Sequence, residues 1–265
     1  MISEELFNNI ISKSKKFKFS SMEYVEYEEL KDCDLILDNE DIIMLVGKSY
    51  YEGHVQIYFA SNTVESLLNS IKILSQKSYV EFIPQEYITQ FKDNKFSIVS
   101  EFVDFFNEDI KNTNIVSVDY CNVVLANKND SKEVSKLLME CQWQSRGFRG
   151  ETTESINEWL DSEYGDIILV KKDEVIVGVC LVSLYGFDSK KGTILWVREV
   201  AVRPSFQSKG YGRTLIEQAF CYGIHNKAVR SFLAADVQNT KAISLYKKYG
   251  FNRNADRGQI NMIQE

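Results

Sequence analysis

The sequence predicts an α/β protein in which a larger C-terminal unit, a mixed central sheet flanked by helices, follows a smaller α/β unit. Apolar runs of strand length alternate with amphipathic helical segments, which is the pattern of sheets covered by helices. A length of 265 residues suffices for two domains of ordinary size. A polar stretch with many turn-forming residues at 107–118 divides the chain, so we expect units at 1–117 and 118–265.

The composition is ordinary for a globular protein, with 44% hydrophobic and 26% charged residues. Thirty-one basic and 38 acidic side chains give a net charge of −7, which disfavours nucleic acid or an anionic membrane as a partner. The one basic cluster, four lysines within 13–18, is expected to be the solvated end of a terminal helix.

The five cysteines show no short pairing and their number is odd, so we expect reduced thiols and a cytoplasmic protein. Because the only histidines are His54 and His225 and there is no Cys-x-x-Cys, neither a metal site nor a histidine-based triad is predicted. The first residues lack the pattern of a signal peptide, and no apolar run is long enough to cross a membrane.

The second unit is predicted to contain ten elements in a regular order. Apolar residues at helical spacing, such as Val134, Leu137 and Leu138, mark its helices, and apolar runs mark its strands. The expected elements are strand 122–126, helices 131–142 and 153–163, strands 166–171, 175–184 and 192–202, helix 210–226, strand 231–236, helix 240–249 and strand 259–263.

The first unit is less regular. We expect a helix whose first residue is capped by Asn62, with Glu65 completing a capping box. The other expected elements are helices near 3–16 and 85–92, strands 42–47, 55–60, 79–83 and 96–99, and a final helical turn at 101–106.

A strand, a glycine-bearing turn and a helix follow one another between residues 194 and 226. The turn reads Gln207-Ser-Lys-Gly210-Tyr-Gly212 and lies directly before the helix. Free backbone N–H groups and the positive end of the helix dipole then point at one place, which suits a pyrophosphate. The alternative is a plain strand–turn–helix junction in which the glycines only permit a tight turn.

Three motifs together resemble the GNAT superfamily of N-acetyltransferases, which transfer an acyl group from acyl-coenzyme A to an amine. They are Glu199-Val-Ala-Val-Arg-Pro204, the Gln-x-x-Gly-x-Gly turn, and Asn239-x-x-Ala-x-x-x-Tyr246-x-x-x-Gly-Phe251. The resemblance covers about 120–258 and implies the GNAT-like acyl-CoA N-acyltransferase fold there. It does not cover 1–117, for which one hypothesis is a degenerate GNAT-like half that shapes the acceptor site or a dimer contact.

The resemblance implies acetyl-CoA as cosubstrate, with no metal. Its pantetheine arm would lie along the strand at Val200–Val202, and its pyrophosphate on the amides of the turn. Asn239 would contact the coenzyme, or would only cap the following helix. The implied cofactor-binding residues are Val200, Ala201, Val202, Gln207, Ser208, Lys209, Gly210, Tyr211, Gly212, Arg213 and Asn239.

Two residues are candidates for catalysis. Tyr246 resembles the family's general acid, which would protonate the leaving thiolate, and the alternative is a core aromatic. Glu199 is the candidate general base for an amine that arrives protonated, and the alternative is an ion pair with a lysine or arginine. Asp236 is a weaker rival for the base.

In the family, the loop between the first two helices sets acceptor specificity. Here that loop is about 142–153, where Arg146 and Arg149 could grip a carboxylate or form a mobile surface. The predicted reaction is direct acetyl transfer to a primary amine of a small molecule or peptide, by a monomer or homodimer. The alternative is a non-catalytic acyl-CoA-binding sensor or scaffold, which would need neither Tyr246 nor Glu199.

Overall fold

The computed structural model describes residues 1–115 and 124–265, with the side chains of 255–257 left aside. Its chain forms two compact units: Met1–Glu101 with Gly258–Glu265, and Phe102–Arg257. The division expected after residue 117 therefore falls inside the second unit. Each unit contains its own hydrophobic cores.

The sheet of the second unit has the strand order β6-β11-β10-β9-β8-β7. Only the β10–β11 pair in this order is parallel, and the other pairs are antiparallel. Its strands are β6 (Phe96–Asn107, of which 102–107 lie in this unit), β7 (Val124–Leu125), β8 (Gly165–Lys172), β9 (Val175–Tyr185), β10 (Ile194–Val202) and β11 (Arg230–Asp236).

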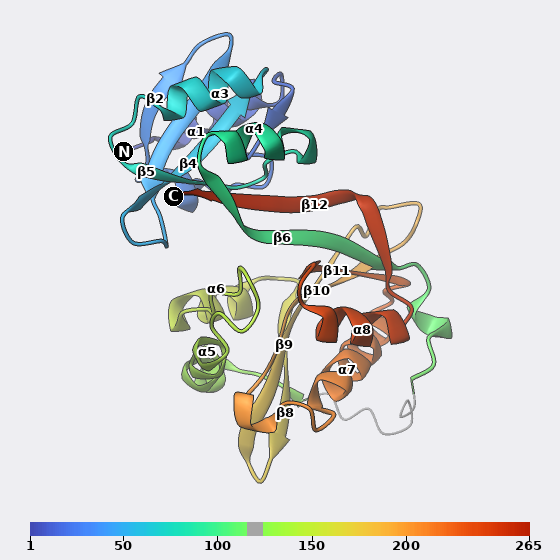
Figure 1. Ribbon diagram of the computed structural model, residues 1–265. Helices are drawn as coiled ribbons and strands as arrows, with labels where there is room; N and C mark the ends of the chain where they lie inside the picture. Colours follow the sequence, from blue (N-terminus) through green and yellow to red (C-terminus); the bar gives the residue numbers. More distant parts are fainter. Residues whose placement is uncertain (116–123) are drawn as a thin grey trace. The chain divides into compact units, whose positions relative to one another are not determined.

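Helices cover both faces of this sheet (Figure 1). On one face, Leu215 and Phe220 of α7 pack into a core that also contains Tyr246 of α8. On the other face, Leu137 of α5 and Ile156 of α6 pack against β8 and β9. These helices are α5 (Ser131–Glu140), α6 (Thr153–Asp161), α7 (Tyr211–His225) and α8 (Thr240–Lys248).

The first unit contains strands in the order β2-β3-β4-β5-β12-β6, and β1 pairs with β4. The C-terminal part of β12 pairs with β5 through Met262 and Val80. The elements are α1 (Glu4–Ser14), β1 (Phe19–Ser20), α2 (Tyr27–Leu30), β2 (Asp34–Asp38), β3 (Ile42–Lys48), β4 (His54–Ser61), α3 (Val64–Ile71), β5 (Lys77–Val80), α4 (Ile88–Asp93) and β12 (Asn252–Gln264, of which 258–264 lie in this unit).

Several expectations for single elements are wrong. Residues 101–106 are not a helical turn but continue β6, because they pair with β11 from Phe102 to Asn107. The cap of α3 is Thr63, not Asn62, and its hydroxyl accepts a hydrogen bond from the Ser66 amide at 3.1 Å. The strand expected at 259–263 lies in the first unit, and β2 was not foreseen.

The cysteines also differ in part from expectation. Cys33, Cys141 and Cys180 are buried free thiols, whereas Cys221 on α7 is disulfide-bonded. Cys121 lies outside the described residues. Within the described ranges, no helix has the length and apolar character needed to span a membrane.

Candidate functional site

The parallel strands β10 and β11 separate part of the way along their length. They pair at Ile194–Arg230, and the last pair is Trp196–Phe232, although β10 continues to Val202. Beyond this point each strand stays paired only on its other side, β10 with β9 and β11 with β6. Within the described part of the chain, the backbone of 198–202 therefore has no strand partner on the side of β11.

A β-bulge explains why the strands separate at this point. The register of β10 against β9 shifts between Val197 and Glu199, so an extra residue is inserted into β10. A bulge bends its strand and increases the local twist. The bulge lies directly after the last β10–β11 pair, and it turns the following residues of β10 away from β11.

Glu199 lies at this bulge and is partly buried. No ion pair holds its carboxylate among the residues that the structure describes. Desolvation raises the pKa of Glu199 to about 7, while Arg198 acts to lower it and Glu151 to raise it. A raised pKa makes the carboxylate a stronger proton acceptor than an ordinary glutamate.

Tyr246 lies on α8 and is buried, with 8% of its surface exposed. Its ring packs edge-to-face on Phe251, with the centroids 6.0 Å apart. Burial raises the pKa of the phenol above its ordinary value, and the nearby Cys180 and Glu199 raise it further. The hydroxyl therefore keeps its proton through the neutral range, and it lies close enough to Glu199 for the two groups to interact electrostatically.

The turn before α7 leaves the N-terminus of that helix open. Gly210 is the N-cap residue, with φ +94° and no side-chain cap. A Cβ added at Gly210 would meet no atom within 4 Å, so the space above the residue is free. The first hydrogen bond of the helix runs from the Thr214 amide to the Gly210 carbonyl at 3.1 Å. The amides of the first turn have no partner within the helix, as is usual at a helix N-terminus.

The side chains of the turn are held away from this space by their own contacts. Lys209 Nζ donates to the Ser205 carbonyl at 2.8 Å. Arg213 Nε donates to Glu217 Oε1 and to the Tyr249 hydroxyl, both at 3.1 Å. The residues Gln207, Ser208, Lys209 and Gly210 are all exposed.

Asn239 is the N-cap of α8. Its side-chain oxygen accepts a hydrogen bond from the Ala242 amide at 3.3 Å. The capping role expected from the sequence is therefore present, and it accounts for this oxygen atom without a ligand.

The segment between α5 and α6 (residues 141–152, the α5–α6 loop) contacts the end of β10. The Cys141 thiol donates to the Val202 carbonyl at 3.3 Å. Gln207 Nε2 donates to Gln144 Oε1 at 2.5 Å and to the same carbonyl at 3.0 Å. Two side chains therefore satisfy the Val202 carbonyl and hold the loop against β10.

Two ion pairs connect the same loop to the strands on either side of the separation. Arg146 Nε lies 3.0 Å from Asp236 Oδ1, at the end of β11, and the Asp236 side chain is fully buried. Glu151 Oε1 lies 2.8 Å from an Arg198 guanidinium nitrogen, and Arg198 also stacks on Trp159, 5.0 Å from the ring centroid. The sequence placed these residues near the site but did not indicate their pairing.

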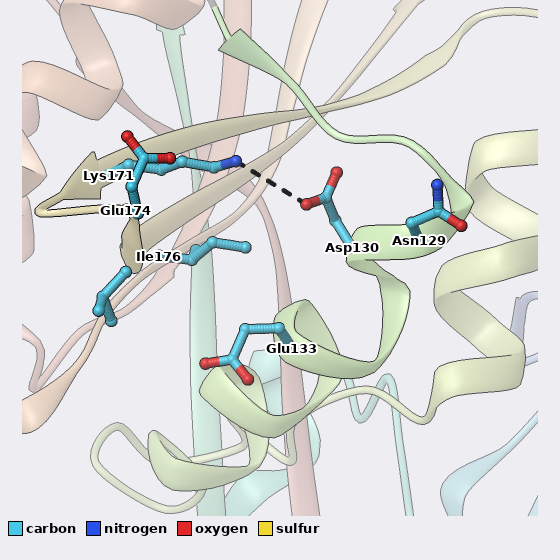
Figure 2. A pocket seen from close by; sticks show the side chains of 7 residues that line it. Asn129, Asp130, Glu133, Lys171, Glu174 and Ile176 are labelled. Atoms are coloured by element: carbon cyan, nitrogen blue, oxygen red, sulfur yellow. Dashed lines mark ion pairs between the residues drawn. The ribbon is translucent and has the colours of Figure 1, made fainter.

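A cavity of about 340 Å³ lies elsewhere in the second unit, between the start of α5 and the β8–β9 hairpin (Figure 2). Lys171 reaches toward Asp130 across it, 3.9 Å away, and Glu133 pairs with Arg203. Because three of its four charged side chains are paired and the fourth, Glu174, is exposed, we assign it no ligand. None of the candidate site residues lines it.

The described residues contain no group of three or more histidine, cysteine, aspartate or glutamate side chains arranged to hold a metal ion.

Comparison with known proteins assigns the second unit to a family. Residues 134–251 match the model of the acetyltransferase (GNAT) family, so this unit contains a GNAT acetyltransferase domain. The matched residues include α6, α7 and α8, the separated strands β10 and β11, and the open turn before α7.

Among individual proteins, the chain is similar to the Bacillus subtilis (strain 168) protein named "Putative ribosomal protein bS18-alanine N-acetyltransferase". The two are 27% identical over 94 residues, which are 36% of this chain and 58% of that protein. The chain thus matches little more than half the length of this relative.

Solved structures with the same fold extend over both units. A GCN5-related N-acetyltransferase from Sphaerobacter thermophilus has a TM-score of 0.56 at 13% identity, over 86% of this chain and 82% of that one. Another from Anabaena variabilis has a TM-score of 0.61 at 10% identity, over 99% and 71%. The GNAT fold expected from the sequence is confirmed.

Proposed function

We propose that this protein is an N-acetyltransferase that moves an acetyl group from acetyl-CoA directly to a primary amine. The observation that carries the proposal is the separation of β10 from β11, with an open helix N-terminus a few residues later along the chain. One edge of β10 is thereby left free for a ligand that pairs with backbone, and the turn offers amides to an anion.

The chain's own groups fit the proposed donor. The space above Gly210 suits a pyrophosphate, because a glycine there would let the anion approach the amides of 208–213. The Gln207 amide, expected to take part, already donates to the Pro204 carbonyl at 3.3 Å. The backbone of Val200–Val202 has no strand partner on the side of β11, and apart from the Val202 carbonyl, which Cys141 and Gln207 already satisfy, it would offer hydrogen bonds to an extended arm. Acetyl-CoA supplies an acyl group activated as a thioester. A backbone N–H of β10 would polarise the thioester carbonyl.

Glu199 is the proposed general base. An amine that arrives as an ammonium ion must lose a proton before its nitrogen can attack. The raised pKa of Glu199 makes its carboxylate a better proton acceptor than an exposed glutamate, while leaving a large ionised fraction at neutral pH. Asp236, the rival base, is already paired with Arg146.

Tyr246 is the proposed general acid. Its hydroxyl holds its proton through the neutral range and can donate it to a leaving thiolate. The electrostatic interaction between Tyr246 and Glu199 supports their placement in one site.

The proposed acceptor is a small-molecule or peptide amine. The relative from Bacillus subtilis is named for an acceptor on a ribosomal protein, which supports an amine but does not select one for this chain. The proposed partners include neither nucleic acid nor membrane, as the acidic composition suggests.

Release of free thiol from acetyl-CoA in the presence of a panel of amines tests the proposal. We expect sustained, amine-dependent release, and a decrease of about 100-fold in kcat for Tyr246→Phe with an unchanged Kd for CoA. Tyr164→Phe, which alters an exposed tyrosine, serves as the control. Tight CoA binding without turnover on any amine would instead favour the acyl-CoA-binding sensor.

A further inference from the structure

The arginines near Glu199 are already engaged by the protein itself. Arg146 pairs with the fully buried Asp236, and Arg198 pairs with Glu151 while stacking on Trp159. Arg149, the other arginine of the α5–α6 loop, also makes interactions within the protein. The sequence left open whether the loop arginines grip a carboxylate or form a mobile surface, and the structure commits Arg146 to Asp236 instead.

Redirecting either of the two paired arginines toward a ligand would be costly. Moving Arg146 would leave the buried carboxylate of Asp236 without its cation. Moving Arg198 would give up both the Glu151 contact and the Trp159 ring. The two pairs are therefore part of the folded site and are not free binding groups.

The charges that remain favour a cation. The charges of Arg146 and Asp236 offset each other, as do those of Arg198 and Glu151. The negative charge of Glu199 has no such partner among these groups. Its carboxylate is partly buried, so its charge is poorly screened by solvent. An ammonium group is attracted to this position, whereas a second carboxylate is repelled.

We propose that the acceptor is a cationic amine that carries no carboxylate on the carbon next to its nitrogen, so free α-amino acids are excluded. The inference rests on the proposed function, in which Glu199 takes the proton of the amine. In an α-amino acid the carboxylate is two bonds from the nitrogen, which places two like charges within roughly 6 Å of each other at Glu199. Decarboxylated amines, polyamines and peptide N-termini avoid this repulsion.

Matched pairs of amines test the inference. Phenethylamine, agmatine and tryptamine differ from phenylalanine, arginine and tryptophan only by the carboxylate. We expect kcat/KM to be at least about tenfold higher for the decarboxylated member of a pair, because a like charge beside Glu199 is disfavoured. Binding of the same pairs to the CoA-saturated protein, measured by calorimetry, should show the same preference.

The variant Glu199→Gln tests the cause. In this variant, the ratio of the dissociation constant of an amino acid to that of its decarboxylated amine should move at least threefold closer to one, because the amide does not repel a carboxylate. The control Glu174→Gln removes a charge from the exposed β8–β9 turn and should leave the ratio unchanged.

The outcomes separate this inference from the proposed function. Amino acids that bind or react as well as their decarboxylated partners, an unchanged ratio in Glu199→Gln, or no binding by any decarboxylated amine would each overturn the inference. Preferential binding of the decarboxylated amines without thiol release would support the inference and overturn only the catalytic proposal.

Discussion

The Tyr249 hydroxyl donates a hydrogen bond of 2.6 Å to Glu217 Oε1, and both residues are buried. Tyr249 directly follows α8, which bears Tyr246, and Glu217 lies on α7, which begins at the open turn. Arg213 donates to both side chains from the first turn of α7. This three-residue cluster therefore connects the two helices that present the proposed general acid and the proposed anion site.

Tyr249→Phe should destabilise the protein by about 1–3 kcal/mol, because a buried carboxylate loses a donor that water cannot easily replace. Burial, together with the bond to Glu217, raises the pKa of Tyr249 to about 12, so the bond persists well above neutral pH. Urea unfolding measures the change. Tyr164→Phe, at an exposed site, should change the unfolding free energy by less than about 0.5 kcal/mol, and an equal loss in both variants would contradict the role of the cluster.

The activity should rise with pH through about 7, since Glu199 accepts a proton only when its carboxylate is ionised. In Glu199→Gln the rise should disappear and kcat/KM should fall by about 100-fold or more. The pH profile of kcat/KM is the measurement. A profile that keeps its limb near 7 in the variant would assign that limb to another group.

The raised pKa of Glu199 also predicts that stability decreases with pH, whereas activity increases. The pKa of Glu199 in the folded protein is raised above the unfolded value near 4.5. The contribution of Glu199 to the free energy of unfolding is therefore highest below pH 4.5 and decreases as pH rises to about 7, because the unfolded state ionises first. Glu199→Gln should therefore raise the melting temperature at pH 8 relative to wild type, and the gain should vanish near pH 4. A gain that does not depend on pH would contradict the raised pKa.

Gly210→Ala should weaken CoA binding, because a Cβ enters the space above the turn and φ +94° is strained for alanine by about 1–2 kcal/mol. Gly53→Ala is a matched control, with φ +76° and equally open surroundings in the first unit. Calorimetry with CoA should detect weaker binding in the first variant only. Equal CoA affinity in both would argue against the turn as the anion site.

Arg146→Met should lower the unfolding free energy by about 1–3 kcal/mol, because it leaves the Asp236 carboxylate buried without its cation. The double variant Arg146→Met/Asp236→Asn should recover much of this loss, since the uncompensated charge is removed as well. A double-mutant cycle by urea unfolding gives the coupling energy. A coupling energy near zero would mean that the pair does not hold the loop.

Local patterns were sufficient for most of the second unit. The helical spacing around Leu137 and the apolar run ending at Val202 predicted α5 and β10 to within a few residues. The glycine turn predicted where α7 begins, because φ +94° at Gly210 is a local requirement of the chain.

Long-range relationships were not predictable in this way. Arg146 and Asp236 are 90 residues apart, and nothing near either residue specifies the other. The separation of β10 from β11 depends on a shift of register against β9, a property of paired strands that one strand's sequence does not contain. Residues 101–106 were misassigned for a similar reason, because their partner strand, β11, lies far along the chain.

The assignment of 258–265 to the first unit bears on how the protein is made. Val80 and Tyr79 of β5 pair with Met262 and Ile263, which leave the ribosome after every residue of the second unit. Domains usually mature in the order of their synthesis. In this protein the first unit lacks part of β12 until the second unit has been synthesised. The edge of β5 that pairs with β12 therefore has no partner strand while the GNAT domain is translated.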